Sequence, residues 1–165
     1  MKIRSSASTN KKVVVQLLNR KTVKGYLNPV ELGATSVLNL LTTDGEHKEI
    51  ALGEVKCVYF VKEFRDAFEP ERKAFLSRPK LDGLWVRLKF KDEDEIEGIV
   101  ANDLLELLDS GVQLTPPDLH GNSLRLFIPR TALSELRVLG VVGAAKHTPR
   151  ATKAPMTGQA ELFHE

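Results

Sequence analysis

The chain has 165 residues, of which 42% are hydrophobic and 28% are charged, and its formal net charge is +2. These values exclude a fibrous or largely disordered chain and allow one medium domain or two small ones. The single cysteine, Cys57, excludes an internal disulfide framework and a cysteine-based zinc site. We expect Cys57 to be a small buried residue, and a lone cysteine fits the reducing cytoplasm.

The stretch that precedes the first predicted strand, residues 1–10, is expected to be a flexible arm. Its basic residues are followed by no apolar region of the kind found in signal peptides. No apolar run in the chain approaches the roughly 20 residues that cross a bilayer. We therefore expect a cytoplasmic protein that makes no membrane contact.

The first predicted element is a β-hairpin. Val13, Val15 and Leu17 recur at a period of two, which indicates a half-buried strand. The polar "NRKT" turn then leads to a second strand around Val23 to Leu27. Three more short apolar runs predict strands at Val37 to Leu41, Lys48 to Leu52 and Val55 to Val61.

The segment that follows contains Phe64, Phe68 and Phe75 among mixed charges. These apolar side chains are expected to anchor the segment to its neighbours. Pro70 and Pro79 limit any helix there to a turn or two. The sequence therefore predicts a packed connector and not a free linker.

The second half of the chain repeats the first. When Gly98 is aligned with Gly25, the positions Val13, Val15, Leu17, Val23 and Tyr26 fall on Val86, Leu88, Phe90, Ile96 and Ile99. The later strands are predicted at Val112 to Thr115, Ser123 to Pro129 and Leu133 to Val141, after a short helix or turn within Asn102 to Gly111. A glycine inside a strand marks a bulge or a close backbone approach, so we interpret Gly25 and Gly98 as structural.

About five short strands in each half predict a mainly β protein built from two tandem small barrels. The predicted boundaries are 11–64 for the first barrel, 65–82 for the connector and 83–142 for the second barrel. Residues 143–165 are rich in Ala, Pro, Thr and Lys and are predicted to be a disordered tail.

The pattern of Val13, Val15, Leu17, Val23, Gly25 and Leu27 resembles the first signature of the Sm-like and SH3-like small-barrel families. That resemblance implies the fold of each half. The stretches "EIALGEVKCV" and "IPRTALSELRV" stand where Sm-like proteins carry an RNA-contacting Asn-Gly or Arg-Gly pair, which both lack. The whole chain also resembles a group of uncharacterised bacterial proteins that share "FVKEF", "LWVRLKF" and "TPPD".

We find no pattern that indicates catalysis, a cofactor or a metal. The four histidines have neither helical i, i+4 spacing nor a carboxylate at a metal-ligand interval. The sequence also lacks a phosphate-binding glycine loop and a nucleophile elbow. The acidic run from Asp92 to Glu97 is interpreted as a solvated turn. We therefore expect a protein that is not an enzyme.

Basic residues gather at the start of the chain, which has no acidic residue before Glu31. Several lie near the two ends of the predicted hairpin, where they could converge on one edge and neutralise phosphates. The candidate nucleic-acid residues are Lys11, Lys12, Arg20, Lys21 and Lys24, with Tyr26 as the stacking partner. In the alternative interpretation, these lysines keep an edge strand from pairing with its neighbours.

The C-terminal segment "QAELF" resembles the short peptide by which many bacterial proteins dock on the DNA polymerase sliding clamp. The resemblance implies that Gln159 supplies hydrogen bonds and that Leu162 and Phe163 fill an apolar pocket of the partner. In the alternative interpretation, the Leu-Phe pair folds back onto a groove of the barrels, in the same chain or in a neighbouring one.

Two functions follow from these observations. The first is a non-enzymatic bacterial adaptor or scaffold that binds a protein partner, with the sliding clamp as one candidate. The second is a nucleic-acid-binding protein that uses the basic first barrel and is associated with the clamp. Exposed barrel edges also make a homodimer an option.

Overall fold

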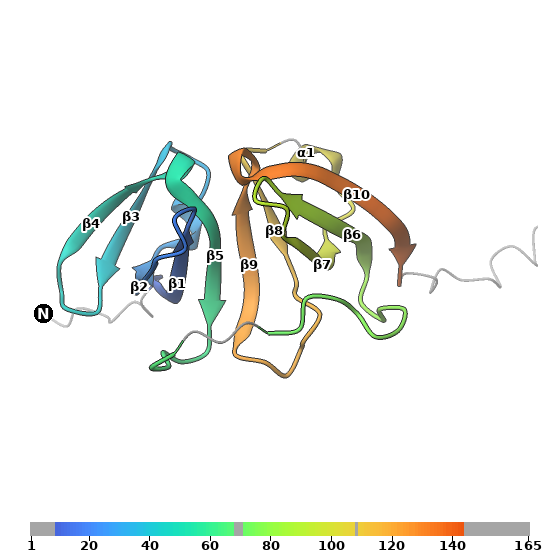
Figure 1. Ribbon diagram of the computed structural model, residues 1–165, viewed down its shortest axis with the longest axis horizontal. Helices are drawn as coiled ribbons and strands as arrows, with labels where there is room; N and C mark the ends of the chain where they lie inside the picture. The colour runs from blue at the N-terminus through green and yellow to red at the C-terminus, as the bar shows by residue number, and fades with distance from the viewer. Residues whose placement is uncertain (1–8, 68–70, 108, 144–165) are drawn as a thin grey trace, which may run out of the picture.

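The computed structural model describes residues 9–67, 71–107 and 109–143. Within these residues the protein is mainly β, as predicted, with ten strands and one short helix, α1 (Leu104–Leu107) (Figure 1). The first half contains β1 (Lys11–Leu17), β2 (Thr22–Leu27), β3 (Val37–Thr42), β4 (His47–Ala51) and β5 (Val55–Val61). The second half contains β6 (Gly83–Phe90), β7 (Glu95–Val100), β8 (Gly111–Leu114), β9 (Ser123–Pro129) and β10 (Leu133–Val142). Three 3-10 turns, η1 (Pro29–Glu31), η2 (Leu52–Glu54) and η3 (Arg130–Ala132), connect strands.

The strands form two antiparallel sheets. One sheet has seven strands in the order β4-β3-β2-β1-β5-β9-β8, and the other has three in the order β10-β6-β7. Figure 1 shows β5 and β9 side by side at the centre, with β1 to β4 on one side and the rest of the second half on the other. The larger sheet therefore continues from the first half of the chain into the second.

The junction of β5 and β9 has one face toward each of two hydrophobic cores. Val58 and Phe60 of β5 and Phe127 of β9 belong to the first-half core. Cys57 and Leu126 belong to the second-half core. Because successive residues of a strand point to opposite faces, each strand serves both cores. Cys57 is fully buried, which confirms the expectation for the lone cysteine.

Both halves follow one order of strand pairing. In the first half, β1 pairs with β2 and β5, β2 pairs with β3, and β3 pairs with β4. In the second half, β6 pairs with β7 and β10, and β8 pairs with β9. Ile99 of β7 forms an isolated bridge with Thr115, the residue after β8, at the place that corresponds to the pairing of Tyr26 with Leu41 in the first half.

The two aligned glycines lie where neighbouring strands approach closely. A Cβ at Gly25 would come within 2.5 Å of the carbonyl oxygen of Leu41 and 2.9 Å of the Leu40 side chain. A Cβ at Gly98 would overlap the side chain of Leu114. Both positions therefore require a residue without a side chain.

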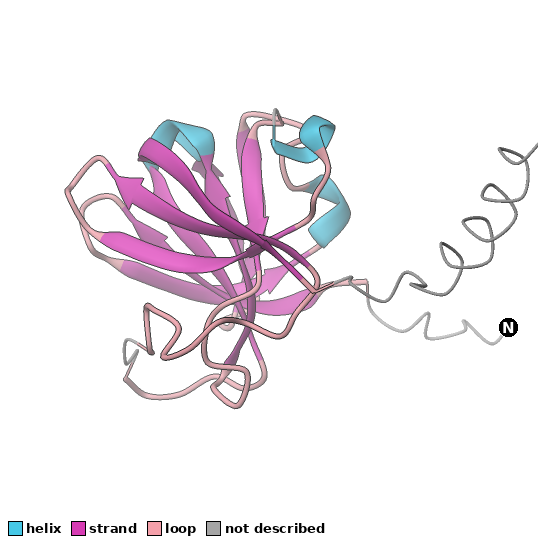
Figure 2. Ribbon diagram, turned by 90° about the vertical axis from the view of Figure 1, so that its right-hand side faces the viewer, coloured by secondary structure: helices cyan, strands magenta, loops and turns pink. Residues whose placement is uncertain are grey.

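The connector between the halves is held at both ends by aromatic contacts. Phe64 packs edge-on against Tyr26 with ring centroids 5.5 Å apart, and Phe75 packs against Trp85 at 6.3 Å. Figure 2 shows the long loops gathered at one end of the strands. No helix in the described part of the chain has the length and apolar character needed to cross a membrane.

Candidate functional site

One sheet edge adjoins an apolar groove. β10 pairs with β6 from Leu133 to Val142, and in the described residues it pairs with no other strand. Beside it lies a groove of about 320 Å³, which is within the size range of ligand sites. Leu107, Val112, Leu133 and Leu136 form its apolar wall, and its remaining lining residues are Arg130, Ser134 and Glu135.

In the first half of the chain, a neighbouring strand covers the position that corresponds to the groove beside β10. β5 and β10 each begin directly after a 3-10 turn, so Val58 corresponds to Leu136 by its distance from that turn. Val58 is fully buried and lies opposite Phe127 in the β5–β9 pairing. Leu136 pairs with Leu88 on one side only and is partly exposed. The groove beside β10 is thus the counterpart of the surface that β9 covers on β5.

A polar cleft of about 580 Å³ separates the two halves at another place. Its charged lining residues are Arg20, Lys56, Lys73, Asp92, Glu93 and Asp94. Since three are basic and three acidic, the cleft does not favour a charged ligand of either sign.

Lys56 is the centre of this cleft and is only 6% exposed. Its Nζ donates to Asp92 at 2.8 Å and to Asp94 at 3.1 Å, and it lies 4.8 Å from the centre of the Phe90 ring. Lys73 of the connector also donates to Asp94, at 2.7 Å. The network joins β5, the β6–β7 turn and the connector.

The charges in this network shift one another's pKa values. Burial by itself would lower the pKa of Lys56, but the hydrogen bonds to Asp92 and Asp94 outweigh it and raise that pKa. The hydrogen bond from Lys56 lowers the pKa of Asp92. Burial opposes the same change at Asp94, where the bonds from Lys73 and Lys56 prevail and lower the pKa. Asp92 is exposed, as expected for a solvated turn, whereas Asp94 is partly buried, and the sequence did not indicate the lysine partners of either residue.

Glu97 lies at the end of the acidic run and is buried, so the interpretation as a solvated turn is wrong for this residue. It is 8% exposed and accepts hydrogen bonds from the Phe75 backbone N–H at 3.2 Å, from Trp85 Nε1 at 3.1 Å and from Arg87 at 3.1 Å. Burial would raise the pKa of Glu97, but these three donors lower it. Its carboxylate fixes the connector to β6.

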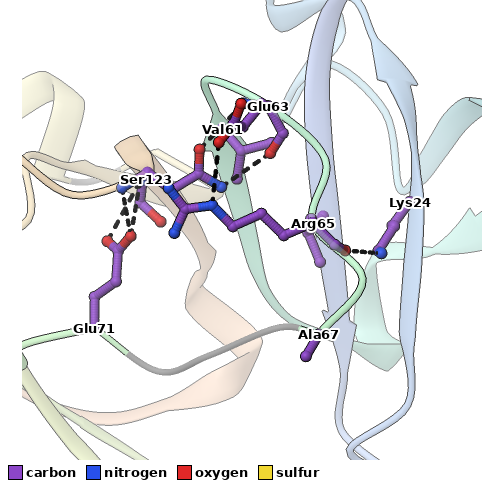
Figure 3. A pocket seen from close by; sticks show the side chains of 9 residues that line it. Lys24, Val61, Glu63, Arg65, Ala67, Glu71 and Ser123 are labelled. Carbon is purple, nitrogen blue, oxygen red and sulfur yellow. Dashed lines mark hydrogen bonds and ion pairs between the residues drawn. The ribbon is translucent and has the colours of Figure 1, made fainter.

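A small cavity of about 20 Å³ lies at the start of the connector and has room for about one water molecule. Figure 3 shows side chains that line it. Glu71 accepts hydrogen bonds from the backbone N–H groups of Asn122 at 2.6 Å and Ser123 at 3.1 Å. Lys24 donates to the carbonyl oxygen of Arg65. These contacts hold the connector in place, and the cavity is too small for a substrate.

The structure does not bring the candidate nucleic-acid residues into one patch. Lys11 and Lys12 start β1, whereas Arg20 and Lys21 follow its other end, so the two pairs are separated by a strand of roughly 20 Å. Lys24 is held by the connector. β1 lies between β2 and β5, so the alternative interpretation of these lysines as protection for an edge strand is wrong.

Tyr26 is also partly covered. Phe64 packs edge-on against its ring, and Lys12 Nζ lies 6.0 Å from the centre of the Phe64 ring. The half-buried Tyr26 therefore offers less surface for base stacking than the sequence suggests.

The predicted docking residues Gln159, Leu162 and Phe163 lie outside the described residues. Within residues 9–67, 71–107 and 109–143, no group of three or more His, Cys, Asp or Glu side chains could hold a metal ion.

A family model described as a family of unknown function, DUF6982, matches residues 9–140. The chain belongs to that family. The matched residues include strands β1 to β9 and most of β10, and they end before the C-terminal segment. Neither the curated proteins nor the solved structures contain a match to the chain.

Sequence reasoning missed the groove, although it placed the strand that borders it. Leu133 and Leu136 are three residues apart in β10, where a period of two would put them on opposite faces. The pairing of β10 with β6 shifts between Leu133 and Glu135, which brings both leucines to the groove. A departure from strict alternation in a strand pattern was the available signal.

Proposed function

We propose that the protein is a non-enzymatic bacterial adaptor that binds a protein partner through β10 and its groove and through its C-terminal peptide. The observation that carries this proposal is the side of β10 that pairs with no strand among the described residues, beside an apolar groove. An open strand edge supplies backbone hydrogen bonds to an incoming segment, and a neighbouring pocket selects its side chain.

We propose further that the fold consists of two tandem small barrels of the Sm-like and SH3-like type, fused along β5 and β9. The shared order of strand pairing supports this interpretation, and so do the close contacts at Gly25 and Gly98. Small barrels of this architecture serve many unrelated functions, so the fold itself does not name the partner.

The C-terminal peptide supplies the second contact in this proposal. Its Gln159, Leu162 and Phe163 resemble the sliding-clamp motif, which makes the clamp of a bacterial host the first partner to test. An adaptor of this kind works in the cytoplasm, with one surface on β10 and another on the peptide.

The test measures binding of purified bacterial sliding clamp to the full chain by calorimetry. We expect saturable binding that is weakened at least tenfold by Leu162→Ala with Phe163→Ala. The matched control is Pro155→Ala with Met156→Ala, which changes two apolar residues of the same segment and should leave the affinity unchanged. Equal affinities for the wild type and both double variants would contradict a role for the Leu-Phe pair.

A nucleic-acid function is the second candidate, supported by the exposure of Lys11, Lys12, Arg20 and Lys21. Binding through phosphates would weaken steeply as salt rises, because counterions are released. We expect Lys21→Glu to leave all binding intact if the adaptor proposal is correct. Loss of nuclease-sensitive binding in that variant would favour the nucleic-acid function instead.

A further inference from the structure

The groove beside β10 is an open version of a contact that the protein makes elsewhere within itself. On β5, the equivalent surface is covered by β9, whose Phe127 is 2% exposed and lies opposite Val58 in the first-half core. On β10, no strand in the described part of the chain covers Leu136 in this way, and its side chain remains partly exposed. An extended segment with a large apolar side chain would therefore fit the groove beside β10.

A second copy of the chain would offer β4, the first-half counterpart of β9, for this place. Phe127 lies three residues before η3, and Glu49 lies three residues before η2, so Glu49 is the corresponding residue. Glu49 is exposed and charged. Insertion of its carboxylate into an apolar groove would cost free energy without a partner to compensate it. Pairing of β10 with β4 of another copy is thus disfavoured.

We propose that the groove is occupied by the C-terminal segment of the same chain, with one side chain of the adjacent Leu162 and Phe163 inserted. This segment lies outside the described residues. It carries an adjacent pair of large apolar side chains, whereas β4 has the charged Glu49 at the position that would enter the groove. Glu161 immediately precedes the pair, and Arg130 supplies a positive charge at the groove. The inference deepens the proposed function, because it concerns the same groove and the same peptide.

The length of the segment permits this contact. Leu162 follows Gly143, the last described residue, by 19 residues. A chain of that length can extend over roughly 60 Å, and its root-mean-square span when unstructured is about 24 Å. The groove near Leu136 is six residues of strand back from Val142, which is about 20 Å. Because the distance to be spanned is close to the root-mean-square span of the segment, the effective concentration of the peptide at the groove is high.

Occupation of the groove by the peptide would couple the two contact sites of the adaptor. A partner that binds either the groove or the peptide must first displace the internal contact. The apparent affinity for that partner then equals the intrinsic affinity multiplied by the fraction of molecules in which the peptide is free. If the peptide occupied the groove in about nine-tenths of the molecules, the apparent affinity would fall about tenfold.

The test compares amide NMR spectra of the full chain, of the full chain with Leu162→Ala and Phe163→Ala, and of the Pro155→Ala, Met156→Ala control. We expect shifts around Val112, Leu133 and Leu136 in the first double variant and none in the control. Addition of a synthetic peptide covering residues 156–165 to the Leu-Phe double variant should restore the wild-type positions. Spectra that are identical at the groove in all three proteins would overturn the proposal.

A groove variant and a dilution series complete the design. When Leu136→Gln is added to the Leu-Phe double variant, with its fold checked by far-UV circular dichroism, the 156–165 peptide should bind at least tenfold more weakly than to the Leu-Phe double variant alone. The wild-type shifts should persist on dilution of a monomeric sample. Groove shifts that vanish on dilution with loss of a dimer would refute docking within one chain. Failure of clamp binding would leave these outcomes unaffected, so the two proposals fail separately.

Discussion

Replacement of Gly98 by alanine tests the packing of the repeat most directly. The new Cβ would overlap the side chain of Leu114, which is 1% exposed in the second-half core. Overpacking of a filled core costs about 1–3 kcal/mol. For a protein of this size, that loss lowers the melting temperature by about 2–12 °C. Gly25→Ala should cost at least as much, because its Cβ meets the Leu41 carbonyl oxygen, a backbone atom that cannot turn away.

Gly53→Ala is the matched control for both variants. A Cβ at Gly53 would meet no atom within 4 Å, so the substitution should change the stability by less than about 0.5 kcal/mol. Urea unfolding followed by the fluorescence of Trp85, the single tryptophan, measures all three proteins. Equal midpoints for Gly98→Ala and Gly53→Ala would refute the argument that strands β7 and β8 require this close approach.

Two further predictions concern the charges between the halves. Lys56→Met should lower the free energy of unfolding by about 2 kcal/mol, less than for a fully buried pair because its aspartate partners are about one-third exposed. The control Lys89→Met removes a surface charge and should leave the urea midpoint close to that of the wild type. Since the pKa values of Asp94 and Glu97 are depressed from their usual 3.8 and 4.5, their contribution is present above those values and is lost as the pH falls through the folded-state pKa values. Thermal melts between pH 6 and pH 2.5 should show this loss and a shallower one in Glu97→Gln, and an identical pH profile in that variant would contradict it.

The strands themselves were readable from the sequence because their apolar runs are short and are bounded by turn residues. The predicted bounds Val55 to Val61 and Ser123 to Pro129 coincide with β5 and β9. Alternation at a period of two located the remaining strands to within a few residues. Local patterns are informative here since each strand buries one face against a nearby core.

The pairing of β5 with β9 was not predicted, because it joins strands that are far apart in the sequence. A signal was nevertheless present in the "VKCVYFV" stretch of β5, which is almost continuously apolar. Such a run indicates a strand that is buried on both faces, as β5 is between the two cores. A strand at the end of an isolated barrel would have shown a more regular alternation.

The acidic turn illustrates a second limit. Spacing within the run from Asp92 to Glu97 gives no sign of Lys56, which lies 36 residues before Asp92 in the chain. Only the folded structure brings Lys56 of β5 and Lys73 of the connector into contact with the aspartates of the turn. Charge runs can be assigned to solvent from the sequence only when no distant partner is buried against them.

The repeat separates residues that determine the fold from residues that distinguish the two ends of the molecule. Gly25 and Gly98 are identical because both halves need the same close approach of strands. Phe127 and Glu49 occupy corresponding places and differ in the property that decides whether a strand can seal an apolar surface. With phenylalanine, β9 covers β5 within the chain, and with glutamate, β4 is disfavoured as a partner for β10 of another copy. The same difference that buries the β5–β9 junction therefore leaves β10 available to a segment of other sequence.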